Sequence, residues 1–293
     1  MAIDVKRIQK SIKKLRKLTS SLPKQSSPEQ VHKLRTNSRK LEATFGSLSL
    51  DSGKNESQLM KQVRRIRRRA GKVRDLDVLT ANLAGVQAEG ETECEVKLLE
   101  YLGSERHKQA GKLHRLVRSE ADELKLRVQK AARDLENVLQ KNSEPASLAA
   151  AHALQLSADL ASPRRLNRGN LHSYRLKVKE LRYVLQLSNS DHHDFVDDLG
   201  DVKDAIGDWH DWEQLIGRAH EVLDHGAGCR LLQKLKQISD ARYEKAINLV
   251  GHLRRNYLRV TAPSKKKPQP VRLAPAAISA TAALSENDRP RAA

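Results

Sequence analysis

Aromatic side chains and cysteines are scarce in this chain of 293 residues. Phenylalanine, tryptophan and tyrosine together make up 3% of the residues, which leaves few large side chains to fill the space between packed sheets. The two cysteines, Cys94 and Cys229, provide neither a disulfide framework nor the paired spacing of a zinc site. They indicate a reducing compartment.

Long apolar runs are missing as well. The N-terminal stretch MAIDVKRIQKSIKKLRKL has no apolar signal core, and no uninterrupted run reaches membrane-spanning length. We therefore expect a cytoplasmic protein, or a nuclear one in a eukaryote, without a membrane partner. A glycine-rich phosphate loop, a GxSxG elbow and an HExxH motif are also missing, so we expect no enzyme, no metal and no cofactor.

Positive charge, by contrast, is plentiful. Lysine and arginine number 55 against 36 aspartates and glutamates, which gives a formal net charge of +19. Such an excess raises the local concentration of polyanions and speeds their capture. Nucleic acid, anionic membranes and inorganic phosphate polymers are the candidate ligands on charge alone.

The composition favours helices, because leucine, alanine, lysine, arginine and glutamate dominate. Apolar periodicity predicts an all-α fold, with helices near 3–18, 28–49, 56–84, 92–141, 146–161, 168–189, 192–223 and 229–259. The longest of these is expected to be kinked near Gly103 or Gly111. Residues 261–293 are rich in proline and alanine, so we predict a disordered basic tail.

The chain carries an internal repeat. VHKLRTNSRKL at 31–41 is matched by LHSYRLKVKEL at 171–181, GKVRDLDVL at 71–79 by GDWHDWEQL at 207–215, and ERHKQA at 105–110 by ARYEKA at 241–246. Three collinear matches at a nearly constant offset indicate a duplication, with a first repeat at about 1–143 and a second at about 144–260. We predict one domain over 1–260, made of two four-helix bundles related by an internal pseudo-twofold axis around a central basic groove or pore.

Basic residues recur at equivalent positions of the two repeats. One helical stripe carries His32, Arg35 and Arg39, and its counterpart carries His172, Arg175, Lys179 and Arg182. Further basic pairs are Arg67 with Lys203, Arg74 with His210, and Arg106 with Arg242. Guanidinium groups bind phosphate oxygens in bidentate fashion, so facing stripes would form a track for a long anion. The run RRIRRR at 64–69 needs a compensating anion or screening, because like charges one turn apart repel.

Other side chains leave alternatives open. His32 and His172 are candidates for phosphate donors, metal ligands or packing residues. Carboxylates at the repeated motif are candidates for helix anchors, for example by pairing Arg74, or for Mg²⁺ ligands or bases: Asp75, Asp77, Asp211 and Glu213. The acidic stretch 191–211 is expected to be a solvated face that offsets nearby basic side chains, with a divalent-ion site at Asp191, His192, His193 and Asp194 as the alternative.

These motifs together resemble the CHAD family, the conserved histidine α-helical domain. The family pattern has an early V-H-x-x-R-x-x-x-R-[RK]-L helix and a later G-x-x-R-D-x-D-V segment, each repeated. The resemblance implies two four-helix bundles whose basic centre binds inorganic polyphosphate without catalysis, in association with polyphosphate granules or polyphosphate-metabolising enzymes. Carried over by position, it implies binding by His32, Arg35, Arg39, Lys40, Arg74, His172, Arg175, Lys179 and Arg182. The repeated basic pairs add Arg67, Arg106, Lys203, His210 and Arg242.

Glu42 departs from the family pattern, because it stands opposite Arg182 where a basic residue is common. The leading hypothesis is a polyphosphate-binding protein. The first alternative is nucleic-acid binding, which the scarcity of aromatic stacking platforms disfavours. The second is a metal-dependent phosphohydrolase that would use the four carboxylates of the repeated motif.

Overall fold

The computed structural model describes residues 5–48, 50, 53–86, 90, 92–141, 144–162, 165–186, 193–224 and 228–258. Met1–Val260 form one compact unit, which contains all of the described residues. Residues 261–293, the predicted disordered tail, lie outside the described ranges.

Helices account for all the regular structure in these ranges, and no strand occurs in them. The predicted all-α fold is confirmed, with helix ends that differ from the predicted ones by a few residues. The helices are α1 (Val5–Ser20), α2 (Pro28–Ser47), α3 (Lys54–Ala84), α4 (Thr92–Lys141), α5 (Glu144–Ala161), α6 (Arg168–Leu185), α7 (His193–Val222) and α8 (Arg230–Tyr257).

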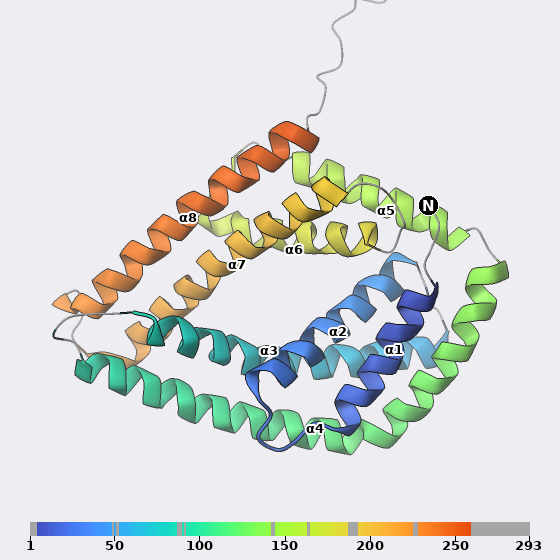
Figure 1. Cartoon of the computed structure of the whole chain (residues 1–293), viewed down its shortest axis with the longest axis horizontal. Helices are drawn as coiled ribbons and strands as arrows, with labels where there is room; N and C mark the ends of the chain where they lie inside the picture. The colour runs from blue at the N-terminus through green and yellow to red at the C-terminus, as the bar shows by residue number, and fades with distance from the viewer. Residues whose placement is uncertain are drawn as a thin grey trace, which may run out of the picture. The chain divides into compact units, whose positions relative to one another are not determined.

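The long helix α4 runs without interruption through Gly103 and Gly111, where a kink was predicted. Figure 1 shows that α4 changes direction farther along, in its lighter green C-terminal part. A glycine inside a helix only lowers its propensity, so it does not by itself produce a bend.

Helices α2 and α6 begin with the same local device. Ser27 caps α2 and Asn167 caps α6, each as half of a capping box that is completed by Gln30 and by Asn170. In both boxes the capping side chain accepts from the N3 amide, and the N3 side chain accepts from the cap amide. The two caps keep the offset of the sequence repeat, so the repeated basic stripes start at the same point of their helices.

The helices pack mainly along the chain. Helix α1 contacts α2 and α4, α2 contacts α3, and α3 contacts α4, which closes a four-helix set. In the second half α5 contacts α6, α6 contacts α7, and α7 contacts α8. Figure 1 shows α1–α4 on one side and α6–α8 on the other. The halves meet where α2 contacts α6 and α3 contacts α7, which are equivalent helices of the two repeats. An exact pseudo-twofold axis stays a prediction.

The apolar cores do not divide by repeat. One cluster of buried side chains takes members from all eight helices, with Phe45, Leu113 and Trp209 among them. A second cluster joins the end of α3 and the start of α4 to the end of α7 and the start of α8, around Leu98 and Trp212. Both clusters contain residues of both halves, so the two halves share their hydrophobic cores.

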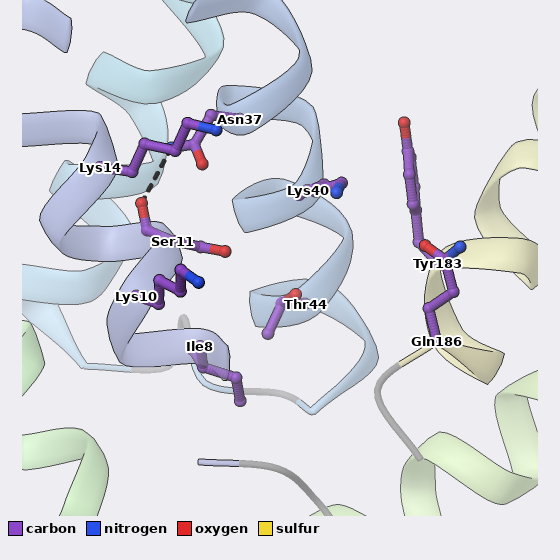
Figure 2. Close-up of a pocket in the computed structure, with 9 residues that line it drawn as sticks. All are labelled: Ile8, Lys10, Ser11, Lys14, Asn37, Lys40, Thr44, Tyr183 and Gln186. Carbon is purple, nitrogen blue, oxygen red and sulfur yellow. Dashed lines mark hydrogen bonds between the residues drawn. The ribbon is translucent and has the colours of Figure 1, made fainter. Parts of the chain in front are cut away.

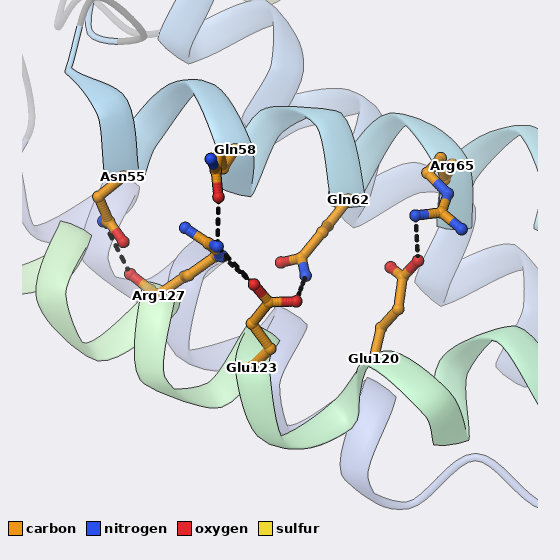
Figure 3. A network of polar contacts seen from close by, with 7 residues as sticks. All are labelled: Asn55, Gln58, Gln62, Arg65, Glu120, Glu123 and Arg127. Atoms are coloured by element: carbon orange, nitrogen blue, oxygen red, sulfur yellow. Dashed lines mark hydrogen bonds and ion pairs between the residues drawn. The ribbon is translucent and has the colours of Figure 1, made fainter.

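Helix α3 is held to α4 by a row of polar contacts, which Figure 3 shows. Gln62 donates to Glu123 at 2.8 Å, and Arg65 pairs with Glu120 at 2.8 Å. Arg127 of α4 reaches Gln58 and Glu123. On the α2 side, Arg64 and Arg67 both pair with Glu42. Internal carboxylates therefore compensate three of the arginines in RRIRRR, for which an external anion or screening was predicted.

Candidate functional site: a basic cavity between α2, α3, α6 and α7

A cavity of about 530 Å³ lies where the two repeats meet. Helices α2, α3, α6 and α7 line it, and these helices carry the first two of the three repeated motifs. It brings together seven of the predicted site residues, namely His32, Arg35, Arg39, Arg74, His172, Arg175 and His210. Both repeats thus contribute histidine and arginine to one site.

Glycines of the repeated motif make room for the arginines. The guanidinium of Arg175 lies against Gly207 of α7, and its Nε donates to the carbonyl of Lys203 at 3.0 Å. A Cβ atom on Gly207 would lie 2.9 Å from Cζ of Arg175, which is closer than real Cβ contacts allow. The contact with Gly207 and the hydrogen bond to the Lys203 carbonyl fix the guanidinium of Arg175. Its remaining N–H groups are therefore held at the cavity wall.

The same arrangement recurs elsewhere between α6 and α7 and in the first repeat. A Cβ atom on Gly200 would lie 3.2 Å from Nε of Arg182, and this Nε donates to the carbonyl of Val196 at 3.1 Å. In the first repeat a Cβ on Gly71 would lie 3.5 Å from Nε of Arg35. An arginine thus lies beside a helix glycine in both halves, but of these three glycines only Gly207 and Gly200, both in the second repeat, have a contact too close to leave a Cβ atom unhindered.

Lys179 is buried, with 8% of its surface exposed. Burial, followed by the charges of Arg175, Arg39, Arg35 and Lys203, lowers the pKa of Lys179 to about 6. Burial also lowers the pKa of Arg39 to about 10, with Arg35 adding to the effect. At neutral pH Lys179 is thus mostly neutral, and the groups that shift it are cations that an anion would offset.

Three histidines line the cavity. The rings of His172 and His210 are 4.2 Å apart between centroids, and His210 Nε2 lies 3.0 Å from the Gln214 amide nitrogen. Burial lowers the pKa of His32 and of His172, with nearby arginines contributing, and it lowers the pKa of His210 to about 4. Nδ1 of His172 is buried and has no hydrogen-bond partner among the described residues. Burial and the neighbouring cations thus keep these histidines neutral at pH 7.

Carboxylates of α3 and α7 also line the cavity. The acidic stretch of α7 was expected to be a solvated face that offsets nearby basic side chains, and its exposed Asp204 fits that expectation. Asp204, Asp208 and Asp211 of this stretch also line the site. Asp204 pairs with Lys203 at 2.6 Å, and Asp208 pairs with Arg242 at 3.2 Å. The spacing of these aspartates by four and three residues, which places them on one face of the helix, was the signal available in the sequence. Burial raises the pKa of Asp211 to about 6, against the opposing effect of Arg175.

Three of the four carboxylates of the repeated motif, Asp75, Asp77 and Glu213, pair with basic side chains. Asp75 lies 3.4 Å from Arg35, so its partner is not Arg74, the residue suggested by the sequence. Asp77 pairs with Arg106 at 2.7 Å, and Glu213 pairs with Arg168 at 2.9 Å. Within the described ranges no three His, Cys, Asp or Glu side chains are grouped to hold a metal ion. Asp191 and His192, from the alternative divalent-ion site, lie outside those ranges.

Several predicted binding residues lie away from the cavity lining. Arg67 pairs with Glu42, and Arg106 also donates to the carbonyl of Ser26 at 2.7 Å. Lys40 lines a neighbouring pocket. Lys203 and Arg242 pair with the lining residues Asp204 and Asp208, and Lys179 lies within the electrostatic influence of the lining arginines. Arg182 contacts Gly200 and the Val196 carbonyl, which do not line the cavity. Arg67 and Arg106 thus hold helices together, whereas the stripes of α2 and α6 form the site.

The fold and the basic cavity define an all-α domain with a site shared by two repeats. The family model described as "CHAD domain" matches residues 6–220, so the chain belongs to the CHAD domain family. The crystal structure of the CHAD domain from the plant Ricinus communis is similar in fold, with a TM-score of 0.52 and 17% sequence identity, over 87% of this chain and 85% of that chain. A comparison with curated proteins gives no match.

The helices of the described ranges are also too polar or too short for a bilayer. None of them combines the length and the apolar character that a membrane span requires.

Proposed function

We propose that this protein binds inorganic polyphosphate in the cavity between α2, α3, α6 and α7, and that it does so without catalysing a reaction on it. The observation that carries the proposal is the convergence of Arg35, Arg39, Arg74 and Arg175 from both repeats on one cavity. Arginine forks match phosphate oxygens, and a polymer of identical phosphate units can use the donors of both repeats at once.

The buried groups around the arginines support the same ligand class. Lys179 is surrounded by Arg39, Arg35 and Arg175, and an anion at the cavity wall would favour its charged form. Asp75 of α3 pairs with Arg35, and Asp211 of α7 lies within the electrostatic influence of Arg175. The ligand would therefore lie toward α2 and α6, away from the carboxylates of α7.

Isothermal titration of long-chain polyphosphate into the protein tests the proposal. We expect the double variant Arg35→Gln/Arg175→Gln to bind at least about tenfold more weakly than wild type, because it removes charge-assisted hydrogen bonds from both repeats. The matched control is Arg115→Gln/Arg118→Gln, which removes two exposed arginines of α4. If both double variants lost the same amount of polyphosphate affinity, binding would be attributed to non-specific charge and not to this site. Wild-type affinity should fall steeply with salt.

Two further measurements separate this proposal from its alternatives. Nucleic acid should displace polyphosphate poorly at equal phosphate concentration, and effective displacement would favour nucleic-acid binding instead. Phosphate release from polyphosphate in the presence of Mg²⁺ or Mn²⁺, abolished by Asp75→Asn, would establish a phosphohydrolase. A tagged copy should colocalise with polyphosphate granules, and it should become diffuse in cells depleted of the polymer.

A further inference from the structure

A second basic pocket lies between α1, α2 and α6, next to the cavity. It has a volume of about 240 Å³, and Figure 2 shows the residues that line it. Lys10 and Lys14 come from α1, Lys40 comes from α2, and Tyr183 comes from α6. In Figure 2 the Lys40 side chain extends from α2 toward the side of the pocket that Tyr183 occupies. Helix α1 carries none of the motifs that pointed to the cavity.

The lining has the chemistry of an anion site. The described residues that form it include three lysines and no carboxylate, whereas four aspartates line the larger cavity. Ser11, Thr44 and Tyr183 add hydroxyl groups that can donate to oxygen anions. The wall between α1 and α2 is fixed, because the buried Asn37 donates to the carbonyl of Ser11 at 2.8 Å. Lysines of two helices thus face one small volume.

The pocket and the arginine-lined cavity are connected by residues that are consecutive in the chain. Arg39 lines the cavity and Lys40 lines the pocket, one residue apart on α2. Tyr183 lines the pocket, directly after Arg182 on α6. Burial raises the pKa of Tyr183, against the opposing charges of Arg39, Arg182, Arg35 and Arg175. Its phenol is therefore a neutral hydrogen-bond donor, and it lies within the electrostatic influence of these arginines.

We propose that this pocket is a second phosphate-binding site, in which Lys10, Lys14 and Lys40 hold further units of the polyphosphate chain that occupies the cavity. The proposal rests on the proposed function. A chain long enough to pass Tyr183 gains contacts with α1, and a short one does not. The pocket therefore makes affinity depend on the length of the polymer.

Helix α1 offers a matched pair of variants. Lys10→Gln/Lys14→Gln removes two pocket lysines, and Lys13→Gln/Lys17→Gln removes two exposed lysines with the same spacing that do not line the pocket. Both pairs change the net charge equally. The probes are long-chain polyphosphate and tripolyphosphate, each titrated at several salt concentrations with all three proteins.

We expect the pocket variant to bind long-chain polyphosphate about fivefold more weakly than the Lys13/Lys17 control, because two ion pairs at a partly exposed site are lost. Its salt slope should be shallower by about 1 for each lysine lost. Tripolyphosphate should bind the two variants equally. Equal long-chain affinities, or an equal loss for tripolyphosphate, would overturn the second site. If wild type bound neither probe, the proposed function itself would fail.

Discussion

At the scale of single residues, the site depends on glycines as much as on arginines. Gly71 and Gly207 occupy equivalent places in the repeated motif, and each leaves the surface of its helix open to an arginine from the neighbouring helix. The sequence showed the repeated glycine but gave no reason for it. Neither glycine has the positive φ that often explains such a residue, since both lie within helices. At Gly207 the reason is space for Arg175, whereas at Gly71 a Cβ atom would make only an ordinary contact with Arg35.

Gly207→Ala should weaken polyphosphate binding while the fold persists. The new methyl group would displace the guanidinium of Arg175 and break its bond to the carbonyl of Lys203, so we expect about a tenfold loss of affinity. Gly217→Ala is the control on the same helix, because its Cβ would meet nothing within 4 Å. That change should leave binding intact and raise the melting temperature slightly, through helix propensity. Unchanged binding in Gly207→Ala would contradict the seating argument.

The lowered pKa of Lys179 predicts that polyphosphate affinity depends on pH. Its pKa is about 6, so at pH 8 the amine is neutral, and a bound polyanion favours its protonation. Binding above pH 6 therefore takes up a proton, and affinity should rise as the pH falls from 8.5 to 7, by at most about tenfold per pH unit for one linked proton. The window stays above the pKa of Asp211, which is about 6, and long-chain polyphosphate keeps a nearly constant charge within it.

The measurement is polyphosphate affinity across this window for wild type and Lys179→Met. The variant should bind with a flatter pH dependence, and identical slopes would exclude Lys179 as the linked group. The lowered pKa of Lys179 also affects stability, which should fall with decreasing pH whereas polyphosphate affinity rises. Because the unfolded chain binds the proton up to a higher pH than the folded one, the protein without added polyphosphate should lose stability as the pH falls toward 6, and Lys179→Met should lose less.

At the scale of helices, the sequence predicted the features that depend on the local order of residues, namely the helices and their basic stripes. Apolar periodicity located the eight helices, and the repeated stripes identified α2 and α6 as helices of the site. It could not predict which basic residues face inward between helices, because that depends on packing partners. Arg67 and Arg106 recur in the repeat as convincingly as Arg35, yet they pair with Glu42 and Asp77.

Glu42 shows how the two repeats solve one packing problem with opposite charges. In the second repeat Arg182 of α6 lies against Gly200 of α7. In the first repeat the equivalent places hold Glu42 and Arg64, which form an ion pair at 3.4 Å. The arginine lies on α6 in the second repeat, and in the first repeat it lies on α3, the partner of α2. The contact between the paired helices is therefore kept while the positions of the charged and bulky side chains are exchanged. The departure from the family pattern at Glu42 is therefore paired with a second change.

At the scale of the whole described unit, the shared cores make the two repeats one folding unit. Each cluster of buried side chains contains residues from both halves, so neither half can lose its packing without exposing apolar surface of the other. The cavity lies at the contact between the halves, so its geometry requires both. A duplication that had kept two separate cores would have left the site dependent on a weaker interface.

The two tryptophans of α7 can test this cooperativity, because Trp209 belongs to the first core and Trp212 to the second. Trp212→Phe leaves Trp209 as the sole tryptophan, and Trp209→Phe leaves Trp212. In urea we expect the tryptophan fluorescence midpoint of each variant to coincide with its own far-ultraviolet circular dichroism midpoint, as two-state unfolding requires. Comparison within one protein removes the effect of the substitution on stability. A Trp212 signal that changes before the helices melt would mean that the second core opens on its own, and that the repeats are coupled only through the first.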